Sequence, residues 1–371
     1  MSTSIRQAAG SLLVVGLSST ELTSLESAWL KLIGPAGVIL FRRNIADATQ
    51  TRALLDAASA LCAEHSFRMV DVEGGAVDRL RDALTPIPSP KAVMQAVEQT
   101  GTTSLIREHG ELVAQAVKAF GFNTTLAPVV DLALRESAAV MGTRTAAATA
   151  AGVLEYARNF VAGLAAHGVI GCGKHFPGLG GGTLDSHLET PVIHRSSREL
   201  WQKDLAPYRA LGNQLPMIMV NHASYPETRG KNQPASISRF WITTMLRKRL
   251  GYRGLIFSDD MEMGGIVKFM PIEEAAVSAI RAGMDLVEIC HSPELILRAF
   301  EALIAEAERS RAFHKLVLAR AGRSAGARAR LFSGRVSSAP TAKQFEALRS
   351  AILGFGETIA KDQPTPETLP A

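Results

Sequence analysis

Short apolar runs alternate with amphipathic stretches along most of the chain. Eight runs are rich in Val, Ile, Leu, Met and Phe, and most are continuously apolar, which is typical of strands covered on both faces. They are Ser11–Leu17, Gly37–Phe41, Phe67–Val72, Thr124–Asp131, Val169–Lys174, Pro216–Asn221, Gly254–Ser258 and Asp285–Cys290. We predict that they form a parallel sheet.

The stretches between these runs show helical spacing. In the first, the apolar positions are Leu22, Leu25, Trp29, Leu32 and Ile33. A capping-box pattern, Ser18 followed three residues later by Glu21, is expected to open this helix, and Gly34-Pro35 is expected to end it. A later helix is predicted to start at Pro271 and to run to about Gly283.

Eight strand–helix alternations predict a TIM-type (β/α)8 barrel, an α/β fold closed on itself, and a doubly wound open sheet is the alternative. We expect residues 1–335 to form this single domain. From Val336 onward Ala, Ser, Thr, Pro and Glu dominate. Residues 336–371 are therefore predicted to be a partly disordered C-terminal tail with one short helix over Ala342–Leu353.

Composition narrows the class of protein. Apolar residues make up 47% of the 371 residues, as in a globular enzyme, and no apolar run is long enough to span a bilayer. The run Ser11–Leu17 faintly resembles a signal peptide, but no small-residue cleavage site follows, so we interpret it as a strand. Cys62, Cys172 and Cys290 are far apart, which favours buried, reduced thiols and a cytoplasmic location.

The formal net charge of +5 has a local origin. Eight basic and no acidic residues lie between Arg309 and Arg335, and the rest of the chain is slightly acidic. This basic segment lacks interleaved aromatic residues and any known nucleic-acid motif. We interpret it as a solvated helix face and expect neither a nucleic-acid nor a membrane partner.

Charged and polar residues gather where the predicted strands end. They are Asp71 and Glu73, Asp131 with Arg144 farther along its loop, Lys174-His175, Asn221-His222 and Ser258-Asp259-Asp260. A barrel places its active site at the carboxyl ends of its strands, so these groups are expected to converge on one pocket.

The loop after the fifth predicted strand is rich in glycine and ends at Asp185-Ser186-His187. In an extended segment, Asp185 and His187 would face the same side, and a carboxylate hydrogen-bonded to one imidazole nitrogen makes the other more basic. The pair is therefore a candidate proton donor. It could equally be a hydrogen bond that only stabilises the loop.

Other interpretations of these residues remain open. Lys174-His175 could be a salt-bridged strand end, and Asp259-Asp260 could open a helix. His175, His187, His222 and Asp185 could bind a metal, although they lack the short spacings of known metal motifs, and we expect no metal and no cofactor. The glycines match neither a P-loop nor a dinucleotide fingerprint.

Three ordered motifs carry a family resemblance. The pattern K-H-F-P-G-x-G followed by D-S-H matches Lys174–Gly180 and Asp185–His187, D-x-E-G-G-x-V-x-R matches Asp71–Arg79, and S-D-D-x-x-M-x-G matches Ser258–Gly265. With weaker matches at Ala127–Asp131 and Pro234–Ser236, they span roughly residues 37–290. The sequence resembles the single-domain β-N-acetylglucosaminidases of glycoside hydrolase family 3.

The resemblance implies a role for each matched residue. Asp259 would be the nucleophile, and His187, supported by Asp185, would be the general acid/base. The residues holding the sugar would be Asp71, Arg79, Arg144, Lys174 and His175. Two positions depart from the pattern: Ala76 often is Arg in the family, and Leu179 often is His or a similar residue. Each departure removes one expected polar contact.

The implied activity is retaining exo-hydrolysis of terminal N-acetylglucosamine from peptidoglycan fragments through a covalent glycosyl-enzyme intermediate. The partner would be a small carbohydrate such as a muropeptide, and the protein a cytoplasmic monomer. A β-N-acetylglucosaminide phosphorylase, a β-glucosidase or β-xylosidase of the same family, a metal-dependent hydrolase and a non-enzymatic sugar-binding protein are the alternatives. Loss of activity on chelation would identify the metal-dependent hydrolase.

Overall fold

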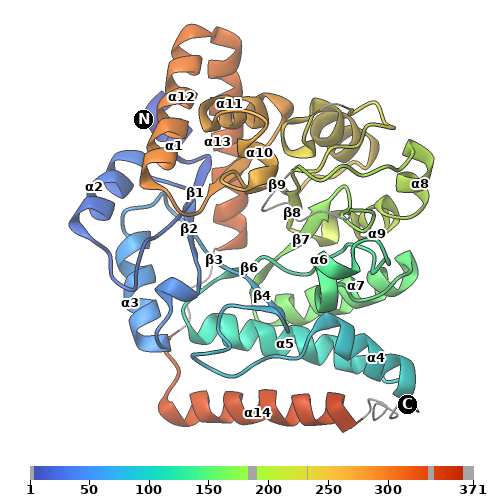
Figure 1. Cartoon of the computed structure of the whole chain (residues 1–371). Helices are drawn as coiled ribbons and strands as arrows, with labels where there is room; N and C mark the ends of the chain where they lie inside the picture. The colour runs from blue at the N-terminus through green and yellow to red at the C-terminus, as the bar shows by residue number, and fades with distance from the viewer. Residues whose placement is uncertain (1–3, 183–189, 232, 333–337, 362–371) are drawn as a thin grey trace.

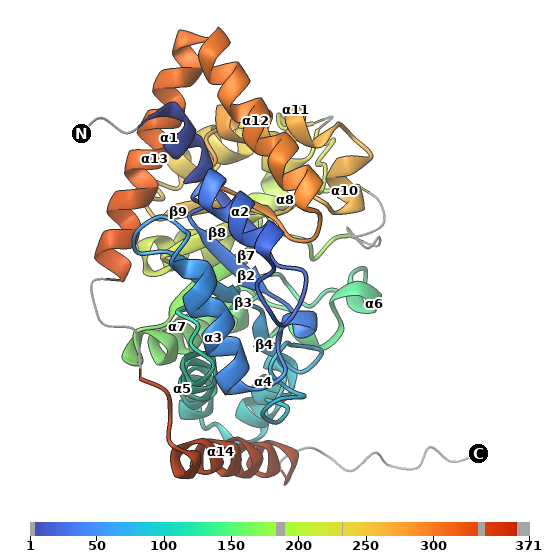
Figure 2. The ribbon, with the colours of Figure 1, turned by 90° about the vertical axis from the view of Figure 1, so that its left-hand side faces the viewer.

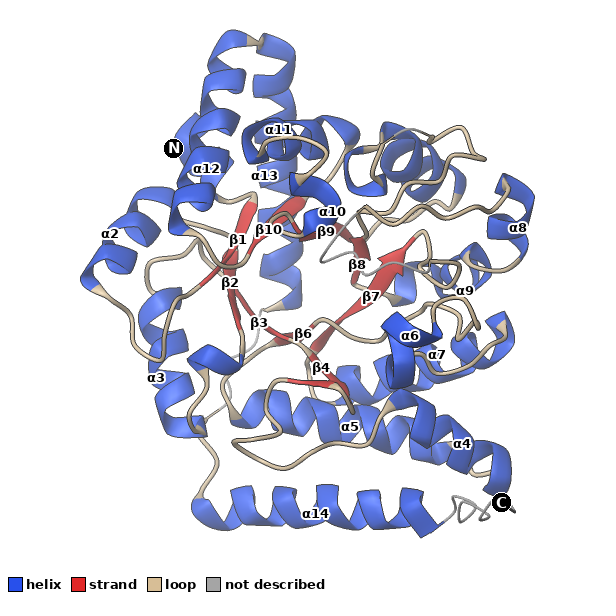
Figure 3. Cartoon of the chain, in the orientation of Figure 1, coloured by secondary structure: helices blue, strands red, loops and turns tan. Residues whose placement is uncertain are grey.

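A computed structural model describes residues 4–182, 190–231, 233–332 and 338–361. Eight parallel strands close into a barrel in the order β1-β10-β9-β8-β7-β6-β3-β2, and helices surround it (Figures 1 and 3). All eight strands predicted from the apolar runs are present, so the barrel is confirmed and the open sheet is excluded. A separate two-stranded hairpin, β4-β5, follows β3.

The barrel strands are short, and the connections that follow them carry most of the helices. The strands are β1 Leu13–Gly16, β2 Gly37–Leu40, β3 Phe67–Val70, β6 Thr124–Thr125, β7 Ile170–Phe176, β8 Met217–Val220, β9 Leu255–Asp260 and β10 Leu286–Ile289, and the hairpin is β4 Val72–Gly74 with β5 Val77–Asp78. The longer helices are α2 Ser24–Ile33, α3 Ala48–Ser59, α4 Pro90–Thr100, α5 Ser104–Ala119, α7 Ala150–Ala166, η5 Phe240–Arg249, α11 Ile272–Ala282, α12 Pro293–Arg309, α13 Arg311–Leu331 and α14 Ala342–Lys361. The shorter ones are α1 Ile5–Gly10, α6 Ala138–Met141, α8 Ser197–Gln202, α9 Leu205–Leu211 and α10 Gly264–Val267, with single turns at η1 Arg42–Asn44, η2 Gly142–Arg144, η3 Gly212–Gln214 and η4 Ala235–Ile237.

The barrel interior is a separate apolar cluster, filled by every second residue of each strand. Its members include Val14, Ile39, Phe67, Met69, Leu126, Ile170, Cys172, Met217, Met219, Leu255, Phe257, Leu286 and Cys290. Because side chains alternate between the two faces of a strand, this pattern also shows which strand-end residues point inward. It continues from Met69 to Asp71, from Cys172 to Lys174, and from Phe257 to Asp259.

The fourth barrel strand is much shorter than predicted. β6 covers only Thr124–Thr125, and beyond it Val129 forms an isolated parallel bridge with Lys174. Pro128 lies between them and has no N–H to donate, which interrupts the regular ladder. Its carbonyl still accepts the N–H of Lys174 at 3.1 Å, so the segment stays attached to β7.

The first long helix begins later than the sequence pattern suggested. Thr23, not Ser18, is its N-cap, and Thr23 forms a capping box with Glu26. Ser18 instead donates to the Glu26 carboxylate from both its N–H (2.8 Å) and its hydroxyl (2.9 Å). The end of the helix at Gly34, in a left-handed conformation, agrees with the prediction. The second predicted helix is α11, for which Pro271 is the N-cap rather than the first residue.

Three helices follow the barrel. α12 and α13 pack against each other, and α14 lies along α5 and α4 (Figures 1 and 2). α14 starts at Ala342 as expected but continues to Lys361, past the predicted end at Leu353, because its second half also has an apolar face: Ile352, Phe355 and Ile359 are buried. None of the helices in the described residues is long and apolar enough to cross a membrane.

The basic segment is not simply a solvated helix face. Arg320 and Arg323 of α13 contact Asp285, which has no exposed surface, at 3.2 and 3.3 Å. Arg247 of η5 pairs with the same carboxylate, and the Ile256 N–H donates to it at 2.9 Å. Asp285 directly precedes β10, so this cluster lies at the amino-terminal end of the barrel and attaches α13 there.

Candidate active site

A pocket of about 490 Å³ opens at the carboxyl ends of the barrel strands. Asp71, Lys174 and Asp259 line it together with His175 and Arg144. Each of the first three follows an inward-pointing apolar residue on its strand, so the strand alternation aims their side chains at the barrel axis. The convergence predicted from the strand ends is therefore present.

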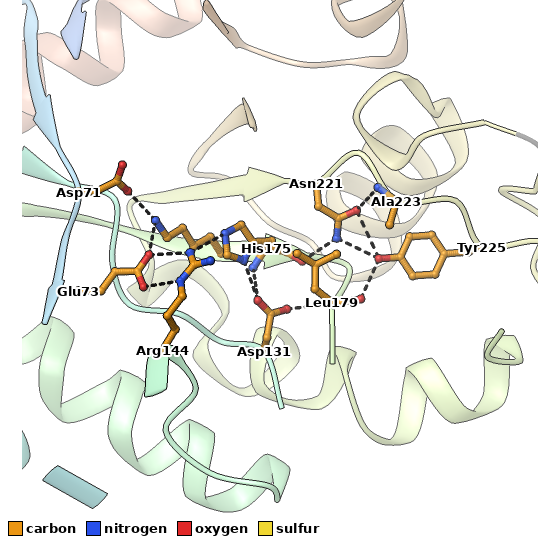
Figure 4. A network of polar contacts seen from close by, with 11 residues as sticks. Asp71, Glu73, Asp131, Arg144, His175, Leu179, Asn221, Ala223 and Tyr225 are labelled. Carbon is orange, nitrogen blue, oxygen red and sulfur yellow. Dashed lines mark hydrogen bonds and ion pairs between the residues drawn. The ribbon is translucent and has the colours of Figure 1, made fainter. Parts of the chain in front are cut away.

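Four charged side chains form a continuous ion network on one side of this pocket (Figure 4). Lys174 Nζ lies 2.7 Å from Asp71 Oδ1 and 2.6 Å from Glu73 Oε1. Arg144 binds Glu73 through two parallel hydrogen bonds, from Nε and from Nη2, each 2.8 Å long. The bidentate pair fixes the plane of the guanidinium group, and Lys174 joins the two acidic residues.

Burial and charge together set the ionisation of this network. Burial alone would raise the pKa of Glu73, but Arg144 and Lys174 outweigh it and lower that pKa to about 2. Burial would lower the pKa of Lys174, yet Asp71 and Glu73 raise it above its usual value. Glu73 and Lys174 are therefore both charged at neutral pH, and Lys174 also lines the pocket together with Arg144 and Asp71.

His175 is held by a separate carboxylate. Its Nδ1 atom lies 2.7 Å from Asp131 Oδ2, and its backbone N–H donates to the same oxygen at 3.1 Å. The other Asp131 oxygen accepts the N–H of Leu179 at 2.7 Å. Asp131 therefore accepts a proton held on Nδ1, and the other ring nitrogen, Nε2, lies 3.4 Å from Arg144 Nη2. Asp131 thus fixes the ring and the start of the glycine-rich loop together.

Asp259 lies at the end of β9, across the barrel from Asp71. Burial would raise the pKa of its carboxyl group. The neighbouring His175, His222 and Lys174, together with the N–H of Asp260 at 3.0 Å, outweigh burial and lower this pKa below its usual value. The group is an anion at neutral pH, as a carboxylate nucleophile requires.

The side chains that follow β8 are engaged with the protein itself. Asn221 donates to the His175 carbonyl at 3.0 Å and to the Tyr225 hydroxyl at 2.9 Å. His222 lies 2.7 Å from the Ser236 hydroxyl and 2.9 Å from the Asp260 carbonyl. Burial lowers the pKa of His222, so the ring is neutral, and its contact with the Asp260 carbonyl supports the end of β9 that carries Asp259.

The remaining predicted sugar contact, Arg79, lies at the edge of the pocket. Its Nη2 atom is 3.9 Å from Asp71 Oδ2, and its guanidinium group stands 5.8 Å from the centre of the Phe41 ring. The two departures from the family pattern differ in position: Ala76 is exposed in the turn of the β4-β5 hairpin, whereas Leu179 is buried and lines the pocket. Leu179 therefore presents an apolar surface to the pocket.

Of the residues considered as metal ligands, His187 and Asp185 lie outside the described residues, while His175 and His222 bind different partners, Asp131 and Ser236. Within the described ranges, a group that could hold a metal ion is Asp260, Glu262 and His291, whose ligand atoms lie within 4.8 Å of one another. Hydrogen bonds to these two carboxylates raise the pKa of His291 to about 9. A proton on His291 therefore already bridges them at neutral pH.

The structure brings together Asp71, Arg79, Arg144, Lys174, His175 and Asp259. Asp185 and His187 lie outside the described residues, and their predicted roles remain predictions. Glu73 and Asp131, which the strand-end pattern placed at this pocket without a role, hold Arg144 and His175 in position. Glu288 is a further pocket residue that was not among the predicted ones. Strand alternation could have indicated Glu288, because it falls two residues after Leu286 on the inward face of β10.

This geometry suits chemistry on a small polyhydroxylated molecule. Ionised donors and acceptors on one side can hold hydroxyl groups in fixed directions, and the Asp259 carboxylate faces them across the barrel mouth. A carboxylate in that position can attack a carbon atom of the bound molecule or stabilise positive charge on it.

Comparison with known proteins agrees with this geometry. Residues 4–319 match the glycosyl hydrolase family 3 N terminal domain. The chain is 38% identical to a beta-hexosaminidase of Alkalilimnicola ehrlichii over 288 residues, covering 76% of this chain and 82% of the relative.

Two solved structures extend the comparison. A family 3 β-N-acetylglucosaminidase from Paenibacillus is 28% identical, with a TM-score of 0.85 over 96% of this chain and 69% of that one. NagZ from Neisseria gonorrhoeae in complex with N-trifluoroacetyl-D-glucosamine is also 28% identical, with a TM-score of 0.76 over 95% and 96% of the two chains. With a family match over most of its length and these similarities, the chain is a glycoside hydrolase and belongs to glycosyl hydrolase family 3.

Proposed function

We propose that this chain is a retaining exo-β-N-acetylglucosaminidase that removes terminal N-acetylglucosamine from peptidoglycan fragments. The observation that carries this proposal is the ionised Asp259 facing the Asp71–Lys174–Glu73–Arg144 network across the pocket. The relatives named beta-hexosaminidase and the N-trifluoroacetyl-D-glucosamine complex of NagZ support an N-acetylated amino sugar as the group that is bound.

The reaction has two steps. Asp259 attacks the anomeric carbon while His187, supported by Asp185, donates a proton to the leaving oxygen, and a covalent glycosyl-enzyme forms. His187 then removes a proton from a water molecule, which attacks the same carbon and releases Asp259. Both displacements invert the anomeric centre, so the released sugar keeps the β-configuration. Asp71, Lys174, Arg144 and His175 hold the ring hydroxyls during both steps.

An exo-acting enzyme needs a pocket that is closed beyond one sugar. The floor of this pocket includes Leu126 and Met219, which belong to the packed interior of the barrel, so a chain cannot pass through it. We further propose that the protein acts as a monomer in the cytoplasm, where a peptidoglycan fragment would reach the pocket as a small molecule.

Turnover of an aryl β-N-acetylglucosaminide by the purified chain tests the activity. We expect Asp259→Asn to lower kcat at least about a thousandfold, because the covalent route is lost. The matched control is Asp260→Asn, one residue away with the same charge change, for which we expect less than a tenfold effect. Near wild-type turnover by the Asp259 variant would rule out Asp259 as the nucleophile.

Added azide distinguishes the two catalytic roles. In Asp259→Ala, azide replaces the lost carboxylate as the attacking group and should produce the α-glycosyl azide. In His187→Ala, azide should intercept the covalent intermediate and produce the β-glycosyl azide. Repeating the assay of the unmodified chain in phosphate buffer separates hydrolysis from phosphorolysis, since release of sugar 1-phosphate would contradict the hydrolytic assignment.

A further inference from the structure

One carboxylic acid in the catalytic pocket has no role in the reaction described above. Glu288 lies on β10 between Leu286 and Cys290, both of which belong to the barrel interior. It lines the same pocket as Asp259, and only 2% of its surface is exposed. A glutamate at this position interrupts an otherwise apolar inward face.

The protein itself leaves the Glu288 carboxyl group poorly satisfied. Within the described ranges, the hydrogen-bond partner of this carboxyl group is the Cys290 thiol, a weak donor that lies 3.4 Å from Oε1. Its backbone N–H donates to Ser258 Oγ at 2.9 Å, which fixes the strand but does not involve the carboxyl group. A buried polar group without a strong partner is costly unless a ligand supplies the missing hydrogen bond.

The surroundings of Glu288 also determine which hydrogen bonds it can make. Burial and the nearby carboxylates of Asp260, Asp71 and Asp259 raise its pKa well above the usual value. The carboxyl group therefore keeps its proton to a higher pH than an exposed glutamate, and in that form it offers both an O–H donor and a carbonyl acceptor. A hydroxyl group, which donates and accepts in the same way, is a matching ligand.

The order of the strands indicates which part of a sugar would reach Glu288. β3, which leads into Asp71, is opposite β9 in the closed barrel, and Asp259 ends β9. A pyranose with its anomeric carbon at Asp259 therefore points its C4 toward Asp71. One long edge of the ring then faces β8, β7 and β6, and the other faces β10, β1 and β2.

The two edges of the sugar differ in their polar groups. The C2–C3 edge carries the acetamido group and a hydroxyl, and the donor-rich side with Lys174 and His175 lies on β7. The opposite edge carries the ring oxygen and the hydroxymethyl group at C5. That edge therefore faces the wall that includes Glu288, Phe41, Arg43 and His291. Within this wall the Phe41 ring and the Glu288 carboxyl group match a methylene carbon and its hydroxyl.

We propose that Glu288 recognises the 6-hydroxyl group of the bound sugar and makes the enzyme selective for sugars that carry a hydroxymethyl group at C5. This inference rests on the proposed glycosidase function, because it takes the anomeric carbon to lie at Asp259. Glu288 is a specificity-determining residue in this scheme and takes no part in bond making or breaking.

The test combines two deletions, one in the protein and one in the substrate. Glu288→Leu removes the carboxyl group with little change in size, and Glu288→Gln keeps one donor and one acceptor. Each is assayed with an aryl β-N-acetylglucosaminide and with its 6-deoxy analogue. We expect the unmodified chain to prefer the 6-hydroxyl substrate by roughly tenfold in kcat/KM, Glu288→Leu to lose that preference, and Glu288→Gln to retain most of it.

Several results would overturn the proposal. An equal loss with both substrates in Glu288→Leu would indicate a structural role, and a shifted response to an analogue lacking the 2-acetamido group would place Glu288 at the other edge of the ring. Calorimetric binding of N-acetylglucosamine and its 6-deoxy form repeats the comparison without turnover. Inactivity of the unmodified chain together with selective binding would reject the proposed hydrolysis alone, whereas equal binding of both sugars would reject the role of Glu288.

Discussion

Two buried ion clusters lie at opposite ends of the same barrel, and they differ in composition. The cluster at the carboxyl ends alternates two acids with two bases, Asp71–Lys174–Glu73–Arg144. The cluster at the amino end has one acid, Asp285, surrounded by Arg247, Arg320 and Arg323.

The difference continues in what satisfies the remaining donors. At the amino end, surplus guanidinium groups bind backbone carbonyls: Arg247 donates to the Tyr252 and Gly254 carbonyls at 3.0 and 2.6 Å, and Arg323 donates to Gly254 at 2.9 Å. At the carboxyl end, Asp71, Arg144 and Lys174 line an open pocket. The amino-terminal cluster is satisfied mainly by the protein, with the buried Nε atoms of Arg247 and Arg320 left without a hydrogen bond among the described residues. The carboxyl-terminal cluster instead has three members that a ligand in the pocket can reach.

The comparison teaches that buried charge alone does not identify a functional site. Both clusters contain groups with almost no exposed surface, and both join segments distant in sequence. We infer that the amino-terminal cluster serves to hold α13 and η5 on the barrel, whereas the carboxyl-terminal cluster serves the reaction. Substitutions in the amino-terminal cluster should therefore lower stability, and substitutions in the carboxyl-terminal cluster should lower activity.

The largest effect is expected from Asp285→Asn. The substitution leaves three guanidinium groups without their counter-charge in a buried position, so the free energy of unfolding should fall by about 3–5 kcal/mol. The kcat of the folded variant should stay within about twofold of the original. Urea denaturation and turnover at 20 °C measure the two quantities, and a fall in kcat without loss of stability would contradict the division between the two ends.

Lys174→Met should produce the opposite pattern. Removing the ammonium group takes away a sugar contact and leaves Asp71 and Glu73 close together, so kcat/KM should fall about a hundredfold, or about 3 kcal/mol of transition-state stabilisation. Arg320→Met is the matched control at the other end and should leave kcat/KM unchanged. Equal loss of activity in both variants would reject the comparison.

A smaller effect is expected when an arginine is replaced by lysine, which keeps the positive charge but loses the planar guanidinium group with its two parallel donors. Arg144→Lys cannot reproduce the bidentate bond to Glu73, and we expect roughly a tenfold loss of kcat/KM. Arg247→Lys makes the same change in the amino-terminal cluster and should lower the unfolding free energy by about 1–2 kcal/mol instead. Steady-state kinetics and urea denaturation midpoints are measured for both variants. They show whether Arg144→Lys mainly lowers activity and Arg247→Lys mainly lowers stability.

The last prediction concerns the acid stability of the carboxyl-terminal cluster. The pKa of Glu73 is about 2 in the folded chain, against an ordinary value of 4.5. Its ionised form therefore stabilises the fold above pH 4.5, and this contribution is lost as the pH falls toward 2. Glu73 contributes at most about 1.4 kcal/mol per pH unit to the slope of the unfolding free energy against pH. Unfolding free energies measured between pH 2.5 and 6 should fall less steeply in Glu73→Gln, and identical slopes would reject this role.

Much of the fold followed from local sequence. All eight strand runs were correct because strands covered on both faces must be apolar, and the positions of Asp71, Lys174 and Asp259 followed from the barrel's geometry. Local signals failed where two patterns competed: Ser18 and Glu21 resembled a capping box as closely as Thr23 and Glu26 did. The structure uses the second pair, and Ser18 donates to the Glu26 carboxylate instead of capping the helix.

The sequence by itself determined the barrel, the strand ends that line the pocket and the motifs of the family. Only the tertiary structure decided which charged groups pair. Lys174 meets Asp71 across 103 positions of the chain, and Asp131 rather than another acid orients His175. The basic helix α13 is likewise partly buried, because Arg320 and Arg323 pair with Asp285 at the amino end of the barrel. Such pairings depend on how distant strands come together when the barrel closes. The spacing of residues within one segment does not determine which distant residues meet.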